Sequence, residues 1–505
     1  MTLVASKLRV VLLKPSKYRI DGFVERFSSG FMPNATLSHI SSLTPGEIGN
    51  TSISVEYIDE YIRPDVNYLQ SLHSVADVTT LVAIVGVQSH QFHRAIDIAA
   101  YAKSHGAENV IIGGPHPMTC DTSDQHKKGV SFSLSEAEVV WREIIEDAIS
   151  GQLKPVYGFN KRWADVVPDI EFRPPPPEEV NRHWVPMVGL YPVRGCPFVC
   201  NFCSVIKIAG RNVRHPSVDS IVAALRKIKR AGVDLVVFTS DNFNKFPLAP
   251  DLLQAMVDEK LGVRFFFQAD TQLANQPELI ELAGRAGGVE VFIGAESFDK
   301  AALKSAQKRH NRPSEYKEIV SQCRDAGIRT HFSNILGFQH QSVGDCHDHV
   351  DTLIDLGPEL ASFYILTPIP GTEQYDDFKT RGLIFEQNLD RFDTATPTFR
   401  HDRINPVALQ QVLFDAYEKF YKASMQNSKC RIDKATRNFM AFCRWCAKNQ
   451  IHPMSGGSGR IKIDHMREYS ACREKVFGVS GPLPLPRSLS LSAADAELNR
   501  QARWN

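Results

Sequence analysis

The sequence predicts an α/β protein in three parts: an open, doubly wound parallel sheet, a partial parallel barrel and a helical C-terminal region. Apolar runs of strand length alternate with helical patterns over residues 1–160 and again over 187–400. Four consecutive prolines, Pro174–Pro177, separate the two series and indicate a stiff, extended connector. After residue 400 the alternation stops. We therefore predict domains at 1–160, 187–400 and 401–505, with a linker at 161–186.

Length and composition are typical of a soluble protein with several domains. The chain has 505 residues, of which 43% are hydrophobic and 23% charged, and its formal net charge is +1. A nearly neutral chain has no overall field to attract nucleic acid. The apolar run Leu8–Leu13 is too short for a membrane span or a signal peptide. We expect a cytoplasmic protein without a membrane span, whose ten cysteines are free or bind metal.

The first domain contains four predicted buried strands and two helices. Helix 92–106 stops at Gly106, and helix 133–151 carries Ser135 as its N-cap and ends at Gly151. β-Branched, apolar runs of this kind are typical of parallel strands covered on both faces. The strands are expected at 9–15, 54–59, 80–87 and 109–114.

The second domain repeats a strand and a helix six times, which is too few for the usual closed eight-stranded barrel. Its helix 217–232 is capped by Ser217 and ends at Gly232. Functional groups in such folds lie at the carboxyl ends of the strands. The strands are expected at 187–193, 234–240, 264–270, 289–295, 329–336 and 359–366.

Three cysteines crowd the loop that follows the first barrel strand. The stretch RGCPFVCNFCS (194–204) places Cys196, Cys200 and Cys203 in a C-x3-C-x2-C pattern. Structural zinc takes four ligands. Three thiolates on a 4Fe–4S cubane would instead leave one iron open to a small molecule. A zinc site and three free thiols remain the alternatives at this point.

The C-x3-C-x2-C pattern, with aromatic Phe202 before its last cysteine, resembles the radical S-adenosylmethionine (SAM) superfamily. The resemblance extends from Met187 to about Arg400 and implies that SAM binds the open iron of a 4Fe–4S cluster held by Cys196, Cys200 and Cys203. One electron, from a donor such as flavodoxin or ferredoxin, would then cleave SAM and release a 5′-deoxyadenosyl radical. Polar strand ends would hold SAM, although each could also cap a helix. The candidates are Phe202, Asp241, Gln268, Asp270, Glu296 and Asn334.

The first domain, with IIGGPHP (111–117) after its fourth predicted strand, resembles the Rossmann-like domain of cobalamin-binding radical SAM enzymes. Two departures are present: the chain has no D-x-H-x-x-G pattern, and Ser135 precedes Glu136 where relatives often carry glycine. The resemblance therefore implies cobalamin bound without a histidine from that pattern, or no cobalamin. The implied contacts are Ser89, His90, Gln91, Gly113, Gly114, Pro115, His116 and Glu136.

The resemblance implies a class B-like methyltransferase that methylates an unactivated carbon or phosphorus of a small-molecule substrate. A rearrangement, cyclisation or alkyl transfer without cobalamin is the first alternative, and a zinc-stabilised binding protein is the second. Neither the substrate nor the oligomeric state follows from the sequence.

The C-terminal region is expected to hold helices at 406–424 and 434–450, then a loosely packed tail. Cys443 and Cys446 lie three residues apart on the second helix and share a face, so an auxiliary cluster is conceivable. No zinc spacing matches, and we predict buried structural cysteines. The remaining cysteines of this region are Cys430 and Cys472.

Overall fold

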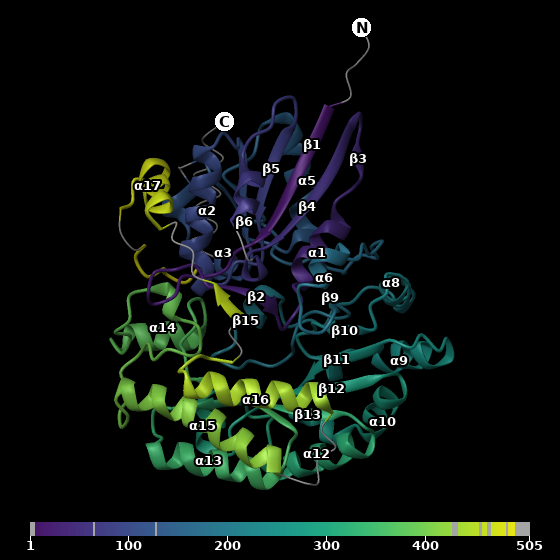
Figure 1. Cartoon of the computed structure of the whole chain (residues 1–505), viewed down its shortest axis with the longest axis vertical. Helices are drawn as coiled ribbons and strands as arrows, with labels where there is room; N and C mark the ends of the chain where they lie inside the picture. Colours follow the sequence, from purple (N-terminus) through teal and green to yellow (C-terminus); the bar gives the residue numbers. More distant parts are fainter. Residues whose placement is uncertain are drawn as a thin grey trace.

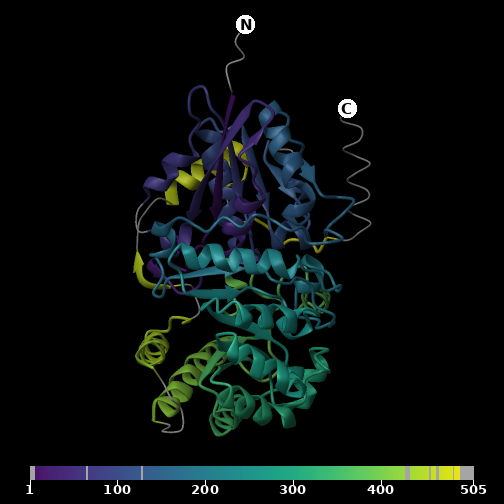
Figure 2. The ribbon, with the colours of Figure 1, turned by 90° about the vertical axis from the view of Figure 1, so that its right-hand side faces the viewer.

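The computed structural model describes residues 6–63, 66–126, 129–426, 433–453, 457–461, 466–480 and 483–489. The N-terminal domain lies at one end of the molecule and the barrel at the other (Figures 1 and 2). Within the described ranges, every helix is too short or too polar to cross a lipid bilayer.

The N-terminal domain is built on a seven-stranded sheet in the order β3-β4-β1-β5-β6-β7-β8. All four predicted strands are confirmed: β1 (Ser6–Lys14), β4 (Thr51–Asp59), β5 (Thr79–Ile84) and β6 (Asn109–Gly113). Three short strands have no sequence signal, because two or three residues show no periodicity. They are β3 (Glu47–Ile48), β7 (Ser131–Ser133) and β8 (Val156–Tyr157).

Helices cover both faces of this sheet because successive residues of β1 point to opposite sides. Leu8, Val10 and Leu12 pack with α1 (Ala35–Leu43) and α5 (Ala137–Ser150). Val11 and Leu13 pack with α2 (Phe92–Ser104) on the other face.

The N-cap of α5 is Glu136, so the predicted capping role of Ser135 is wrong. Leu134 donates its N–H to the carbonyl of Tyr157 in the sheet, which keeps the chain extended past the expected start of the helix. The Ser135 hydroxyl donates to the carbonyl of Lys161, 2.9 Å away.

The second domain is a six-stranded parallel sheet in sequential order, as predicted. Its outer face packs against helices, while the inner face lines an open half-barrel. The predicted cap of α8 (Val218–Arg230) is confirmed, since Ser217 Oγ accepts the N–H of Ser220 at 3.1 Å. The strands are β9 (Met187–Leu190), β10 (Leu235–Phe238), β11 (Arg264–Ala269), β12 (Gly288–Glu296), β13 (Arg329–Leu336) and β14 (Leu360–Ile365). The helices between them are α8 (Val218–Arg230), α9 (Ala249–Asp258), α10 (Pro277–Arg285), α11 (Lys300–Ser305), α12 (Tyr316–Asp325) and α13 (Val343–Leu356).

The C-terminal region returns to the N-terminal domain. After α15 (Pro406–Gln426) and α16 (Lys434–Lys448), β15 (Gly457–Ile461) pairs antiparallel with β2 (Arg26–Gly30), and α17 (Met466–Phe477) packs on α2. Residues 483–489, expected in a loosely packed tail, are docked, with Leu489 N–H donating to Thr119 O at 2.9 Å. The C-terminal segment therefore ties both domains together.

Short elements complete the fold. The α-helices are α3 (Pro115–Thr119), α4 (Ser123–His126), α6 (Pro177–Val180), α7 (Val205–Ile208) and α14 (Glu373–Thr380). The 3₁₀ turns are η1 (Glu60–Ile62), η2 (Asn67–Leu72), η3 (Ser89–Gln91), η4 (Phe243–Lys245), η5 (Thr271–Asn275), η6 (Pro313–Glu315) and η7 (Leu389–Arg391).

Candidate functional site

The three cysteines of the C-x3-C-x2-C pattern lie at the carboxyl end of the barrel sheet, on the loop after β9, as predicted. Burial raises the pKa of Cys200 to about 11 and that of Cys203 to about 12. The charge of Cys196 raises both pKa values further, so the three sulfurs lie within electrostatic reach of one another. Free thiols here are protonated at neutral pH, and metal binding would release their protons.

Close backbone packing fixes the loop just before the first cysteine. Gly195 has φ +89°, and a Cβ there would lie 2.1 Å from the carbonyl oxygen of Asn212. The Gly195 N–H donates to Asp241 Oδ2 at 2.6 Å. Arg194 and Arg214 exchange two backbone hydrogen bonds of 2.8 and 2.9 Å. The position of Cys196 is therefore set by both sides of the loop.

In the part of the chain that the structure describes, no group of three His, Cys, Asp or Glu side chains is arranged to hold a single metal ion. A cubane does not need such convergence, because each thiolate binds a different iron. Cys443 and Cys446 are both fully buried on α16, as predicted for structural cysteines. Cys472 is also buried, on α17, and Cys430 lies outside the described residues.

A buried ion pair stands beside the cysteines at the end of β12. Lys308 Nζ lies 2.6 Å from Glu296 Oε1, and Ser333 Oγ donates to the other carboxylate oxygen at 3.1 Å. The charge of Lys308 lowers the pKa of both Cys200 and Cys203 against the effect of burial. The sequence predicted Glu296 as a site residue but missed Lys308, which lies twelve positions further along the chain. Lys308 is therefore a described cation whose charge acts on two of the three thiols.

We expect Lys308→Met to make the cluster harder to reduce. A cation near an anionic cluster stabilises the reduced state of the cluster, because the cation attracts the negative charge that reduction adds. The potential at which the cluster's paramagnetic resonance signal appears should shift to more negative values. Lys304→Met, which removes an exposed lysine of α11, is the matched control and should leave the potential unchanged. Equal potentials in the two variants would contradict this role for Lys308.

Three other predicted SAM contacts surround the same end of the barrel. Asn242 connects two parts of the site, since its Nδ2 donates to Asp270 Oδ2 at 2.7 Å and lies 3.9 Å from Cys196 Sγ. Asp270 also caps η5 by accepting from the N–H of Gln272. Gln268 is partly exposed and lines a cavity inside the barrel. Phe202 lies in the cysteine loop, with its ring centre 5.8 Å from Lys308 Nζ.

Asn334 lies on the opposite face of the sheet from these residues. It alternates with Ser333, whose hydroxyl points inward to Glu296. Its side chain hydrogen-bonds the carbonyl of Phe332 at 2.9 Å and His349 Nε2, on α13, at 2.9 Å. We therefore leave Asn334 out of the proposed SAM site.

A cavity of about 240 Å³ joins the N-terminal sheet to the cysteine loop. Four of the predicted cobalamin contacts line it: Gly113, Gly114, Pro115 and Glu136. Its other wall includes residues that flank the cysteine loop, namely Tyr191, Arg194 and Asp241. The sequence could not predict this wall, because it depends on how the two domains pack.

The other four predicted cobalamin contacts do not line this cavity. Ser89 Oγ and His116 Nδ1 hydrogen-bond one another at 3.0 Å. Gln91 Oε1 accepts from Lys14 Nζ at 2.6 Å. Burial and the charge of Lys17 lower the pKa of His90 to about 3, so its imidazole is neutral.

The buried carboxyl group of Asp59, at the end of β4, should make the stability of the protein depend on pH. Burial raises the pKa of Asp59 to about 6, against the opposing charge of Lys14. Between about pH 4 and pH 6 the folded protein holds a proton that the unfolded chain releases, so this contribution to stability is lost as pH rises. The parent should lose up to about 3 kcal/mol of unfolding free energy relative to Asp59→Asn when the pH is raised from 4 to 7. Urea unfolding at both pH values measures this, with exposed Asp251→Asn as the control; an equal difference there would contradict the assignment.

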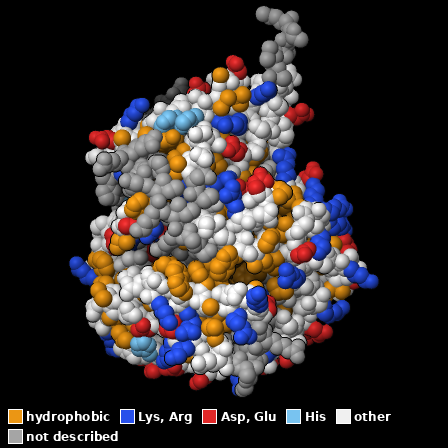
Figure 3. All heavy atoms as spheres, in the orientation of Figure 1, with side chains coloured by type: hydrophobic (Ala, Val, Ile, Leu, Met, Phe, Trp, Pro, Cys, Tyr) orange, Lys and Arg blue, Asp and Glu red, His pale blue; other side chains and the backbone are white. Residues whose placement is uncertain are grey.

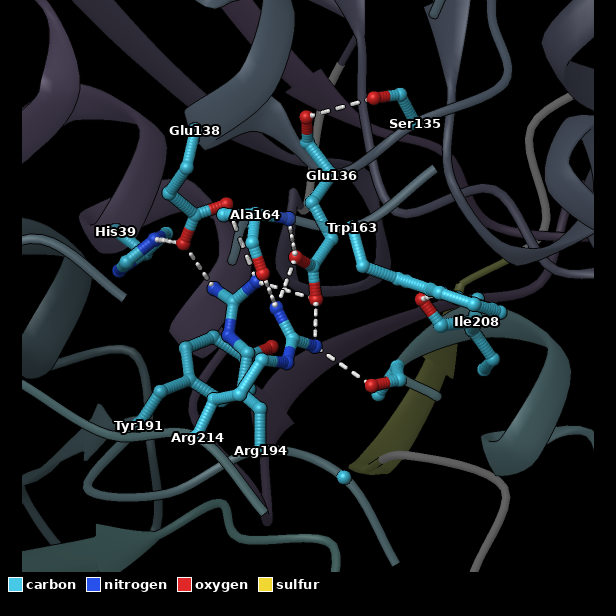
Figure 4. Close-up of polar contacts among 12 residues, drawn as sticks. His39, Ser135, Glu136, Glu138, Trp163, Ala164, Tyr191, Arg194, Ile208 and Arg214 are labelled. Atoms are coloured by element: carbon cyan, nitrogen blue, oxygen red, sulfur yellow. Dashed lines mark hydrogen bonds and ion pairs between the residues drawn. The ribbon is translucent and has the colours of Figure 1, made fainter. Parts of the chain in front are cut away.

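Ion pairs between the two domains hold the cysteine loop against α5 (Figure 4). Arg194 NH2 lies 2.8 Å from Glu138 Oε1, which also contacts His39 Nε2 at 2.6 Å. Arg214 forms a two-point pair with Glu136, at 2.6 and 2.7 Å. These side chains are all largely buried, with Glu138 only 1% exposed. The start of α5 therefore positions both ends of the loop that carries the cysteines.

The fold and the site together define a class of enzyme. An open sheet packed against a six-stranded half-barrel, with three cysteines on the loop after the first barrel strand, is the architecture of enzymes that pair an iron–sulfur cluster with SAM.

Comparison with known proteins identifies the family. The model of the radical SAM superfamily matches residues 190–353. Bacteriochlorophyllide d C-12(1)-methyltransferase of Chlorobaculum tepidum is 30% identical over 338 residues, 65% of this chain and 72% of the relative. The C-8(2)-methyltransferase of the same organism is 22% identical over 413 residues, 76% of this chain and 84% of the relative. The chain belongs to the radical SAM superfamily, and its cofactors include a 4Fe–4S cluster and SAM.

A solved structure shares the whole architecture. The radical SAM methyltransferase TsrM from Kitasatospora setae, with cobalamin and a [4Fe-4S] cluster bound, superposes with a TM-score of 0.59 at 15% identity. The match covers 94% of this chain and 99% of TsrM and shows a common fold. Membership of an enzyme family excludes the zinc-stabilised binding protein considered from the sequence.

Proposed function

We propose that this enzyme is a cobalamin-dependent methyltransferase acting on an unactivated carbon of a small molecule. The observation that carries the proposal is the cavity shared by the edge of the N-terminal sheet and the cysteine loop. A cofactor in that cavity would lie between the two domains, next to the cluster site. The relatives named as methyltransferases support the same reaction.

A cavity of about 240 Å³ would take one part of a corrinoid, and its residues fit that part. Gly113 ends β6 and Gly114 follows it, where small residues let a large ring approach the backbone. Behind them, apolar residues between the sheet and the helices, such as Ile111 and Trp141, would hold an apolar nucleotide base. The one histidine among the lining residues, His39, is engaged by Glu138. This agrees with the absence of the D-x-H-x-x-G pattern and favours a corrinoid whose cobalt receives no histidine from the cavity.

Bound cobalamin would supply a transferable methyl group. The protein's own part is to position the cofactors and to exclude water. Cys196, Cys200 and Cys203 would hold the cluster, while Lys308 offsets its charge and Glu296 fixes Lys308. Asp241 holds the backbone before Cys196 and also faces the shared cavity, so it connects the cluster loop to the cobalamin site. A reductase protein such as flavodoxin or ferredoxin would provide electrons.

Anaerobic reconstitution with iron and sulfide, with and without added hydroxocobalamin, tests the proposal. With SAM and a reductant, we expect 5′-deoxyadenosine in both preparations. S-Adenosylhomocysteine, the product of methyl donation, should require cobalamin, and one cobalt per chain should be retained after desalting. Retention of no cobalt, with 5′-deoxyadenosine formed, would overturn cobalamin dependence and favour a radical reaction without it.

A further inference from the structure

A second cavity, of about 610 Å³, lies inside the half-barrel. It is lined by inward-facing residues of all six barrel strands and closed on its open side by α16. Fourteen of its twenty lining residues are apolar or aromatic. A cavity of this size and composition is typical of a small-molecule site.

The rings inside the cavity are only partly covered. Phe266 on β11, Phe292 on β12 and Tyr364 on β14 share the inner face and stay partly exposed, whereas Phe265 and Phe267 on the outer face are fully buried. Half-covered aromatic faces inside a barrel favour an occupant with an apolar, preferably conjugated, ring. Phe292 lies four residues before Glu296 on the same strand, and the pairing with β13 shifts by one residue between Gly294 and Glu296. A large occupant could therefore extend from the cavity towards the SAM end of the barrel.

An aromatic rim borders the cavity: Phe31, Trp184 and Phe439 line it, and Phe442 and Trp445 on α16 continue the ring contacts outside the lining. These residues come from three separate segments: the end of β2, the end of the proline-rich linker, and α16. Ring centres lie 4.7 Å apart for Phe31 and Trp184, and 5.2 Å apart for Trp184 and Phe442. Trp184 is 44% exposed and Trp445 54% exposed. Hydrophobic side chains gather across the middle of this face around a hollow (Figure 3).

The charged groups of the cavity are already paired with one another. Glu290 contacts Arg329 at 3.3 Å and His331 at 3.0 Å, and Arg329 also contacts Asp433 at the start of α16, at 3.2 Å. Among the described residues that line it, the cavity therefore offers no unpaired cation to a phosphate buried inside it. The contact between Arg329 and Asp433 also fixes the start of α16 to the barrel at the edge of the cavity.

We propose that the substrate is a large, flat, conjugated ring molecule that enters past the aromatic rim and lies in the barrel cavity against Phe266 and Phe292. This inference rests on the proposed function and names its substrate class. Paired charges and aromatic walls select against nucleotides, because their phosphates would lose hydration without gaining a cation.

Binding to the reconstituted full-length protein tests the proposal, with protoporphyrin IX as the probe and quenching of tryptophan fluorescence as the readout. Ala435→Trp places an indole at the cavity edge from an exposed position of α16 and should weaken probe binding at least tenfold. Ala441→Trp makes the same change at another exposed position of α16, outside the cavity lining, and should bind within twofold of the parent.

Three outcomes would overturn the substrate class: no saturable binding of protoporphyrin IX, equal affinity in Ala435→Trp and Ala441→Trp, or tighter binding of cytidine diphosphate or deoxycholate. The proposed function is tested separately, by measuring formation of 5′-deoxyadenosine and S-adenosylhomocysteine in the absence of substrate. Ala435→Trp should retain 5′-deoxyadenosine formation at the parent rate, because its new side chain does not touch the cluster loop.

Discussion

Cys203→Ser should eliminate detectable SAM cleavage and lower bound iron to a small fraction of the parent's. A serine hydroxyl is a poor iron ligand, and a cluster held at two corners has two open irons where SAM chelation requires one. The expected loss in 5′-deoxyadenosine formation is at least about 10³-fold, the scale typical of removing an essential catalytic element. Anaerobic iron and sulfide analysis, with chromatographic assay of 5′-deoxyadenosine, measures both effects.

Cys472→Ser is the matched control because it changes a buried cysteine of α17, in the segment that packs on α2. Its iron content and SAM cleavage should equal the parent's. Full activity in Cys203→Ser would refute the assignment of the cluster to this loop, whatever the control shows.

Glu138→Gln should destabilise the protein by about 3–5 kcal/mol, since it strands a buried arginine charge. Among the described carboxylates, Arg194 would keep an ion pair with Glu136, at 3.5 Å, and that carboxylate already pairs with Arg214. Because Gly195 and Cys196 follow Arg194 directly, the iron content after reconstitution should fall as well. Denaturant unfolding and iron analysis, both under anaerobic conditions, measure the two losses.

Glu146→Gln provides the comparison within the same helix. Glu146 pairs with Arg142 on the exposed surface of α5, where the two side chains are 47% and 75% exposed. Its loss should cost no more than about 0.5 kcal/mol. The double variant Glu138→Gln/Arg194→Gln should recover part of the lost stability by removing the stranded charge, while its iron content stays low. Equal destabilisation by Glu138→Gln and Glu146→Gln would contradict the proposed positioning role.

Strand–helix alternation predicted the fold well because each long element carries its own periodic signal. All six barrel strands and the four long strands of the first sheet lie where apolar runs indicated. The pairing of β2 with β15 could not be predicted, since both strands are short and polar and lie at opposite ends of the chain. The N-cap of α5 was misplaced by one residue because a sheet hydrogen bond from Leu134 outweighs the local preference of Ser135.

The cysteine loop was predictable because its chemistry depends on sequence spacing alone. Strand parity would have placed Asn334 outward, since Arg329, His331 and Ser333 alternate on the inner face. Lys308, Arg214 and the aromatic rim depend on contacts between distant segments, and no local pattern distinguishes them from ordinary surface or core residues. Positions that act through tertiary contact remained hidden, whereas the three cysteines proposed as cluster ligands lie together on one short loop and could be found from their spacing.

The late arrival of β15 has a consequence for biosynthesis. Gly30 and Gly457, which pair in this small sheet, are 427 residues apart. At typical translation speeds β2 emerges from the ribosome roughly 20–90 s before its partner is made. During that interval the β2 edge and the face of α2 that later receives α17 are uncovered, so nascent chains should recruit chaperones at the N-terminal domain. Products shortened by stop codons late in the message should misassemble, although they contain Cys196, Cys200 and Cys203.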